Sequence, residues 1–264
     1  MNSLVTSLDA TPAKGLLKNV TPDGLQGLLQ GYRITSIKRT GKWIAFHLDQ
    51  SVYSPGWVLL SHLGMFGSWR LQPSKPLAPD PHTRLILQLS QGAEQPELTY
   101  TDVRNWGRIH LFAPEDARKF LLSRIGPDAL EVPLHYMTNL MGLDRRMVCV
   151  SLLDQTFVAG IGNIYRSEIL WSARIDPGRP SCDLTPQEIS TIRSEMQRIL
   201  RLAIEQRGCT VQSYRGSDGK SGNFQKHLNV YGRAGRICHR CQAFLRETVV
   251  WDGRKVFYCN FCQV

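Results

Sequence analysis

Short hydrophobic runs separated by turn-forming residues characterise the first 113 positions of the chain. Runs rich in β-branched, aromatic and aliphatic residues occur at 34–37, 43–48, 58–63, 85–89, 98–100 and 108–112. Gly and Pro punctuate these runs, most densely in the proline-rich stretch 72–81. Many short strands joined by such turns predict a β-sandwich or barrel. One helix is expected here: Thr21-Pro22-Asp23 has the form of an N-cap and first turn, and the helix should end at Leu29.

The hydrophobic period becomes helical after Pro114. A helix is predicted from Ala117 to Ile125, followed by a domain link at Gly126-Pro127. The segment Thr185-Pro186-Gln187-Glu188 is a capping box with proline at the first helical position. An apolar stripe follows at helical spacing and stops before Gly208, at positions 189, 192, 196, 199, 200 and 203. Another helix is expected to begin after the segment 159–163.

Two Cys-x-x-Cys motifs lie near the end of the chain. Cys238 and Cys241 are separated from Cys259 and Cys262 by seventeen residues, 242–258. Four thiolates at this spacing suit a tetrahedral structural zinc site. The span between them predicts a hairpin, with strands at 248–251 and 255–258 and a two-residue Asp-Gly turn at 252–253. The alternative is two unrelated pairs, redox-active or incidental. We therefore expect one structural Zn²⁺ in a zinc ribbon.

The composition suits a multidomain polyanion-binding protein. With 264 residues and 42% hydrophobic content, the chain can form two modest domains and the ribbon. No apolar run approaches the roughly 20 residues of a membrane span, and no signal peptide is evident. The net charge is +10, and residues 207–264 contribute ten Lys/Arg against three acids. A basic, metal-bound tail favours nucleic acid as partner, although charge for solubility alone is the alternative. Three further cysteines suit a reducing compartment, hence cytoplasm or nucleoid.

Two loops of the β region carry large apolar or cationic residues between glycines. The segments are Gly64-Met65-Phe66-Gly67 and Arg104-Asn105-Trp106-Gly107. Exposed apolar wedges together with arginine are used to unstack a duplex, although both loops could instead fold onto the core. Gly160-Ile161-Gly162-Asn163 opens a helix and could bind a phosphate, or allow a close helix contact. The basic, Gly-rich stretch 217–222 indicates an exposed loop.

Together these segments resemble the formamidopyrimidine-DNA glycosylase and endonuclease VIII family of base-excision repair enzymes. The resemblance extends from Ile34 to Cys262. Besides the four cysteines, its most specific segments are 39–43 (RTGKW), 62–68 (HLGMFGS), 100–107 (YTDVRNWG), 153–168 (LDQTFVAGIGNIYRSE), 217–222 (SDGKSG) and 230–233 (VYGR).

The resemblance implies an N-terminal β-sandwich, a helix–two-turn–helix domain and a C-terminal zinc finger, acting as a monomer on damaged duplex DNA. The expected bounds are 1–113 for the β-sandwich, 114–131 for a linker helix, 132–235 for the helical domain and 236–264 for the zinc finger. The family's functional residues correspond to Lys42, which assists near the sugar, and to Arg254, which grips the phosphates beside the lesion. The implied DNA-binding residues are Met65, Arg104 and Trp106, which fill the gap left by a flipped base, Asn163 and His82 at phosphates, and Lys220 in the loop over the extruded base.

One family feature is not found in the sequence. Family members begin, after the initiator Met, with Pro-Glu-Leu-Pro-Glu, whose proline amine attacks the sugar. This sequence begins Met1-Asn2-Ser3-Leu4, and residues 1–9 match the family's first strand. A family lysine position is also replaced, within 148–150. Three hypotheses follow: a bifunctional glycosylase/AP lyase for oxidised purines whose start lies upstream, a damaged-DNA-binding member with little or no glycosylase chemistry, or a zinc-ribbon nucleic-acid module of another class.

Overall fold

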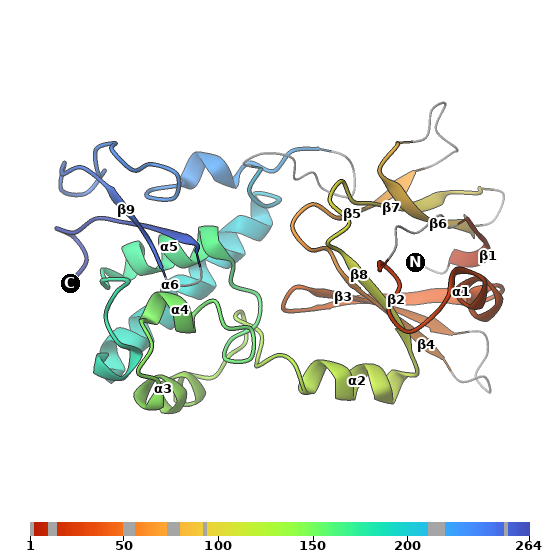
Figure 1. The fold of residues 1–264 in the computed structure, drawn as a ribbon, viewed down its shortest axis with the longest axis horizontal. Coiled ribbons are helices and arrows are strands. Elements are labelled where there is room, and N and C mark those ends of the chain that lie inside the picture. The colour runs from red at the N-terminus through yellow and green to blue at the C-terminus, as the bar shows by residue number, and fades with distance from the viewer. Residues whose placement is uncertain are drawn as a thin grey trace. The chain divides into compact units, whose positions relative to one another are not determined.

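The protein divides into two compact units. The computed structural model describes residues 3–9, 15–49, 56–72, 80–91, 94–210, 220–250 and 253–264. The first unit comprises residues 1–123 and 210–222, and the second comprises residues 124–209 and 223–264. Figure 1 shows the antiparallel sheet of the first unit and the helices and ribbon of the second.

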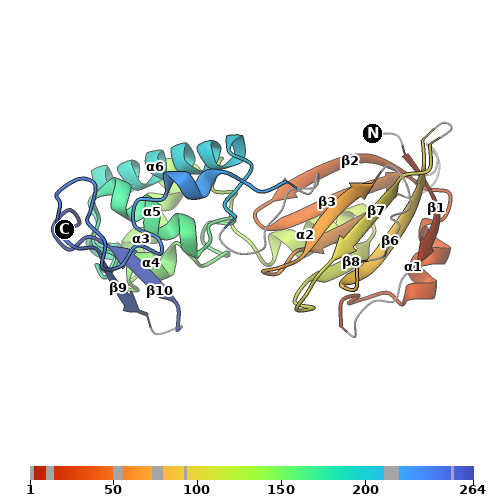
Figure 2. The same ribbon diagram turned by 90° about the horizontal axis from the view of Figure 1, so that it is seen from above.

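Eight antiparallel strands form the first unit. Their order in the sheet is β5-β7-β6-β1-β2-β3-β4-β8. The ladder between β1 and β2 is short, at Ser3–Ile34 and Leu4–Arg33, and the strands on its two sides form the two layers of the sandwich (Figure 2). The expected β-sandwich is confirmed. The strands are β1 (Ser3–Asp9), β2 (Arg33–Thr40), β3 (Trp43–Asp49), β4 (Trp57–His62), β5 (Ser68–Gln72), β6 (Thr83–Ser90), β7 (Glu97–Thr101) and β8 (Arg108–Phe112).

Two helices accompany this sheet. α1 (Pro22–Leu29) has the predicted cap, with Thr21 Oγ1 accepting a hydrogen bond of 3.1 Å from the Gly24 amide. α2 (Pro114–Leu122) packs on β4 and β8 through Ala117. The prediction of a helix from Ala117 to Ile125 was wrong at both ends. Proline is favoured in the first helical turn, so the helix starts at Pro114.

Strand register places several strand ends together at one end of the sandwich. Trp43 pairs with His62, and His62 pairs with Arg108. In the other layer Thr101 pairs with both Ser68 and Thr83. The loops that follow β4 and β7 connect the two layers. The β2–β3 turn, both loops and the start of β6 therefore lie at this end.

Helices form most of the second unit. They are α3 (Leu134–Leu143), α4 (Val148–Ser151), α5 (Asn163–Ala173) and α6 (Pro186–Glu205), with 3₁₀ turns η1 (Ser181–Asp183) and η2 (Phe224–His227). The capping box between Thr185 and Glu188 is present as predicted. α6 ends before Gly208, which has a φ of +83°. No helix among the described residues is both long and apolar enough to cross a membrane.

The ribbon consists of β9 (Arg246–Val249) and β10 (Lys255–Tyr258), which pair in antiparallel fashion. β10 has the predicted bounds, whereas the strand predicted at 248–251 is β9, which ends at Val249. Val249 pairs with Lys255, so the connection spans 250–254. The Val250 side chain is buried in the core of the unit, its amide donates to the Arg254 carbonyl at 3.0 Å, and its carbonyl accepts from the Gly253 amide at 2.8 Å. Positions 251 and 252 of the predicted hairpin lie outside the described residues.

Candidate nucleic-acid interface and metal centre

The two predicted wedge loops present their side chains to solvent. Met65 is 72% exposed and Trp106 is 50% exposed. The Arg104 guanidinium lies 4.5 Å from the centroid of the Phe66 ring and 5.2 Å from that of Trp106. The alternative in which both loops fold onto the core is therefore not observed. A cation that lies against two aromatic rings can contact bases and phosphates together.

Lys42 lies in the β2–β3 turn at the same end of the sandwich. Gly41 takes a φ of +58° at the first turn position, as a type II′ hairpin requires, and Lys42 is exposed beside it. Burial, Lys42 and Arg108 together lower the pKa of His62. The Gly64 amide donates to His62 Nδ1 at 3.1 Å, which requires that nitrogen to be unprotonated. A neutral His62 therefore holds the start of the loop that carries Met65.

His82 and Lys220 belong to the same unit as the two loops. The His82 amide donates to Asp80 Oδ1 at 2.8 Å, and its carbonyl accepts from the Asp102 amide at 3.0 Å, so the end of β7 holds His82 in place. Lys220 is exposed. The Gly222 amide donates to Thr210 Oγ1 at 2.9 Å and closes the base of that segment. Positions 217–219 of the predicted loop lie outside the described residues.

In the second unit, Arg166 connects Asn163 to the ribbon. Asn163 is the first residue of α5, and its side-chain oxygen accepts a hydrogen bond from Arg166. The fully buried Arg166 also donates to the carbonyl oxygens of Cys149 and Lys255, at 3.1 and 3.0 Å. Lys255 directly follows Arg254, which is exposed. One guanidinium therefore holds both predicted phosphate-binding positions of this unit.

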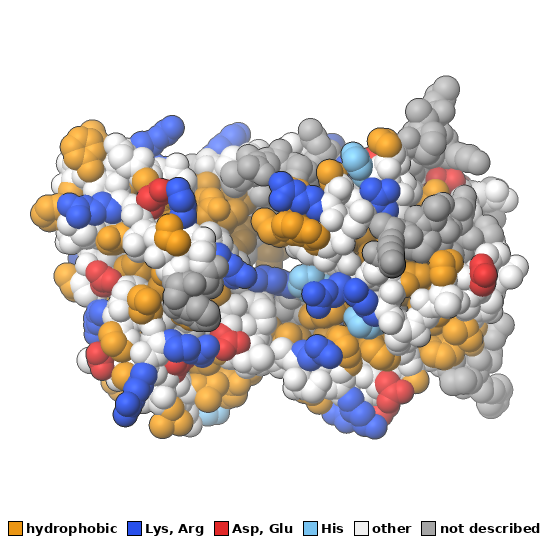
Figure 3. All heavy atoms as spheres, viewed as in Figure 1, with side chains coloured by type: hydrophobic (Ala, Val, Ile, Leu, Met, Phe, Trp, Pro, Cys, Tyr) orange, Lys and Arg blue, Asp and Glu red, His pale blue; other side chains and the backbone are white. Residues whose placement is uncertain are grey.

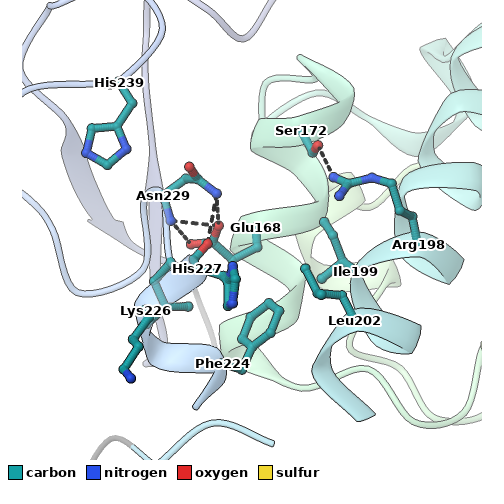
Figure 4. Close-up of a pocket in the computed structure, with 11 residues that line it drawn as sticks. Glu168, Ser172, Arg198, Ile199, Leu202, Phe224, Lys226, His227, Asn229 and His239 are labelled. Carbon is teal, nitrogen blue, oxygen red and sulfur yellow. Dashed lines mark hydrogen bonds between the residues drawn. The ribbon is translucent and has the colours of Figure 1, made fainter. Parts of the chain in front are cut away.

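Glu168 fixes the segment that leads into the ribbon. Its buried carboxylate accepts hydrogen bonds of 2.9–3.1 Å from the backbone amides of Asn229, Val230 and Tyr231. The Asn229 side chain donates a further bond, and Figure 4 shows both groups on the wall of a surface pocket of about 330 Å³. Carboxylates that accept several amide hydrogen bonds are strongly held. The ribbon is thus attached to the middle of α5.

The four ribbon cysteines form the predicted metal centre. Their sulfur atoms all lie within 4.8 Å of one another, with Cys238–Cys262 at 3.9 Å and Cys241–Cys259 at 3.5 Å. A tetrahedral zinc with bonds of about 2.3 Å would place its sulfurs about 3.8 Å apart, so the cluster fits one Zn²⁺. Gln263 accepts from the Cys259 amide and donates to the Ile175 carbonyl, both at 2.8 Å. The predicted structural zinc site is confirmed, and the alternative of two unrelated pairs is wrong.

Sequence reasoning did not identify four residues that hold these groups: His62, Asp102, Arg166 and Glu168. Burial in the structure explains why three of them need partners. Arg166 and Glu168 lie in a helix whose residues are otherwise largely buried, and a charge in such a helix must find partners. Asp102 lies directly after the fully buried strand β7, where a carboxylate is similarly unexpected.

The chain matches two family models and many known proteins. The formamidopyrimidine-DNA glycosylase N-terminal domain matches residues 2–109, and the H2TH domain of the same glycosylase matches residues 125–215. The formamidopyrimidine-DNA glycosylase of a Roseiflexus species is 37% identical over 250 residues, covering 94% of this chain and 88% of that protein. The one from Geobacillus kaustophilus is 37% identical over 246 residues, covering 92% and 85%.

Solved structures of Lactococcus lactis Fpg are similar to the chain over nearly its whole length. A complex of a mutant Fpg with Fapy-dG-containing DNA has a TM-score of 0.89 at 28% identity, covering all of this chain and 93% of that one. A complex with abasic-site DNA has a TM-score of 0.87 at 29% identity, covering 99% and 93%. A mixed α/β protein with this sandwich, H2TH helices and a four-cysteine centre has the architecture of a DNA glycosylase. The chain belongs to the formamidopyrimidine-DNA glycosylase family.

Proposed function

We propose that the protein is a base-excision repair DNA glycosylase that binds duplex DNA containing a damaged base or an abasic site. Family membership supports this function, because relatives across nearly the whole chain are formamidopyrimidine-DNA glycosylases. The Lactococcus lactis structures contain DNA with an abasic site or with Fapy-dG. Oxidised purines are therefore the proposed lesion class. A zinc-ribbon module of another class is not favoured, since the matched domains lie outside the ribbon.

The observation that carries the proposal is the exposed group Met65, Arg104 and Trp106 at one end of the sandwich. Removing a base from a duplex leaves a gap, which apolar and aromatic side chains fill. Lys42 at the same end of the sandwich offers an ammonium to the sugar and its phosphate, and His82 offers an imidazole to a phosphate. Lys220 would contribute to closing over the extruded base.

Asn163 and Arg254 are the proposed phosphate contacts of the second unit. The start of α5 presents backbone amides, which favour an anion, and Arg254 adds a guanidinium to the same anion-binding surface. In Figure 3, each unit taken by itself has basic side chains next to hydrophobic ones. Zn²⁺ would keep the ribbon folded and would take no part in the reaction. A location in the cytoplasm, at the nucleoid, would suit a role on chromosomal DNA, and three cysteines outside the metal centre agree with a reducing compartment.

Two assays test the proposal with the full chain. Gel-shift titration with a duplex containing a tetrahydrofuran abasic analogue should give a Kd at least about ten-fold lower than the same duplex with no lesion. Incubation with an end-labelled duplex containing Fapy-dG, quenched with borohydride, should give strand cleavage and a covalent protein–DNA adduct if an amine attacks the sugar. Lesion preference without adduct or cleavage, even after hot alkali that cuts the strand at abasic sites, would retain damaged-DNA binding and reject glycosylase chemistry. Equal affinity for both duplexes would reject the proposed function entirely.

A further inference from the structure

Asp102 is a carboxylate buried beneath the exposed wedge loop. It lies just after β7, and its side chain is fully buried. Oδ1 accepts from the Arg104 amide at 3.0 Å, and Oδ2 accepts from the Gly107 amide at 2.7 Å. Among the residues that the structure describes, no Lys, Arg or His nitrogen lies within ion-pair distance of this carboxylate. Its charge is therefore compensated mainly by two backbone amides from opposite ends of one loop.

The loop between these amides has one defined conformation. Asn105 takes a φ of +56°, which only a minority of non-glycine residues adopt, and its side-chain oxygen accepts a hydrogen bond of 2.6 Å from Arg84 Nε. Arg104 and Trp106 flank Asn105 and point outward next to each other. An exposed indole on a loosely held loop would tend to pack back onto the protein surface. Asp102 and Arg84 hold the loop from below and from the side.

The Tyr100 hydroxyl lies beneath both loops. A Cβ at Gly107 would lie 1.8 Å from Tyr100 Oη, and one at Gly67 would lie 2.2 Å from it. A Cβ at Gly64 would lie 2.9 Å from the carbonyl carbon and oxygen of Trp106. The two loops therefore contact each other, and both pack against the Tyr100 hydroxyl. The Tyr100–Asp102 hydrogen bond is long, at 3.5 Å, so Asp102 acts on the loop chiefly through the amides.

We propose that Asp102 is a positioning residue that preorganises the loop bearing Arg104 and Trp106 for insertion into an interrupted duplex. Because the loop is ordered before DNA binds, the conformational entropy of ordering it does not oppose binding. This preorganisation benefits only DNA that has a gap to receive the loop. Phosphate contacts elsewhere serve damaged and intact duplex alike. The inference rests on the proposed function, and it concerns how lesion preference arises.

The test compares Asp102→Asn and Asp102→Ala with the wild-type chain. Asparagine keeps one acceptor but presents an NH₂ group to the second amide, and alanine removes both acceptors. The ratio of Kd for intact duplex to Kd for tetrahydrofuran duplex should fall about three-fold with asparagine and about ten-fold with alanine. Affinity for intact duplex should change less than two-fold. Tyr100→Phe removes the long hydrogen bond but leaves both amide hydrogen bonds of Asp102 in place, so it should keep the wild-type ratio.

A direct probe of insertion separates positioning from general destabilisation. A duplex with 2-aminopurine opposite the abasic analogue reports insertion, because the wild-type protein should change the 2-aminopurine fluorescence as Trp106 enters the base stack. At saturating concentration, Asp102→Ala should give less than half of that change. Asn105→Gly removes the hydrogen bond to Arg84 without altering the core, so it tests loop positioning even if the Asp102 variants fail to fold. It should also lower the ratio of the two Kd values. Wild-type ratios and emission in these variants would overturn the inference. Absence of preference in the wild-type chain would instead overturn the proposed function.

Discussion

Arg166 donates a hydrogen bond of 3.0 Å to the carbonyl oxygen of Lys255, joining α5 to the ribbon strand β10 across 89 positions of sequence. The same guanidinium binds the side chain of Asn163 at the start of α5. A planar guanidinium can donate in several fixed directions, which lysine cannot do. The phosphate-binding positions proposed for the second unit therefore share one buried support.

Replacing Arg166 by methionine should destabilise the second unit. The side chain keeps similar bulk, but the carbonyl oxygens of Cys149 and Lys255 lose a charged donor while they remain buried. The expected loss is about 3 kcal/mol in the free energy of unfolding. Urea unfolding followed by far-UV circular dichroism at 222 nm measures it, since helices dominate this unit. Arg198→Met, at an exposed position on α6, is the matched control and should cost under about 0.5 kcal/mol. A loss below about 1 kcal/mol for Arg166→Met would contradict the assignment.

Removing the metal should release the ribbon and abolish DNA binding. A structural zinc site of four thiolates supplies much of the folding free energy of so small an element. Chelation, or Cys241→Ser, should release zinc in a colorimetric assay and raise the Kd for tetrahydrofuran duplex by more than ten-fold. Cys182→Ser changes a cysteine outside the cluster and should leave both measurements unchanged. Full DNA affinity in the metal-free chain would show that the ribbon is dispensable.

Arg254→Ala should weaken binding to all duplexes by a similar factor. A phosphate contact adds about one unit to the dependence of log K on log salt, so the slope should fall by about one. Fluorescence anisotropy between about 50 and 200 mM salt measures it. Arg118, an arginine on α2 that pairs with Glu115, provides the control variant. An unchanged slope for Arg254→Ala would remove this residue from the phosphate contacts.

Trp106→Ala should reduce binding to abasic duplex by about ten-fold, which corresponds to the loss of one stacking interaction. Binding to single strands should change much less if the indole acts as a wedge in a duplex. Leu122→Ala removes a similarly exposed apolar side chain from α2 and should have no effect. Equal losses on both types of DNA would argue for ordinary stacking on bases instead.

Acid should destabilise the second unit partly through Asp144. Hydrogen bonds from Arg146, together with one from Ser151, lower the pKa of Asp144 from 3.8 to about 2. A carboxyl whose pKa is lower in the folded than in the unfolded state stabilises the fold above its unfolded pKa. That contribution is lost as the pH falls from about 4 through 2. Urea midpoints measured from pH 6 to pH 2 should therefore fall less steeply for Asp144→Asn. Parallel profiles for the variant and the wild-type chain would contradict this contribution.

The sequence predicted the larger elements and the metal centre because their signals are local. Cysteine spacing and the capping box at Thr185 depend on residues a few positions apart, and both were confirmed. α4 was not predicted, because its Val148-Cys149-Val150 run favours a strand by intrinsic preference. All four of its residues are buried, so tertiary packing determines its conformation.

The supports of the candidate site are non-local, which explains why the sequence did not reveal them. Glu168 binds amides 61–63 positions away, and no periodicity marks such partners. The end of β9 was predicted too late for a similar reason. The turn dipeptide at 252–253 predicted a strand running to 251, but the strand ends at Val249 and the Val250 side chain is buried in the core of the unit.

The contact between Gly64 and Trp106 limits how this protein can be re-engineered. A side chain at position 64 would clash with the backbone of the other loop at Trp106. A loop exchanged alone would therefore need to fit the unchanged backbone of the second loop. Changes in lesion preference should therefore require paired exchange of 63–67 and 102–107. In evolutionary terms the two loops should be inherited as one unit, although they are far apart in the sequence.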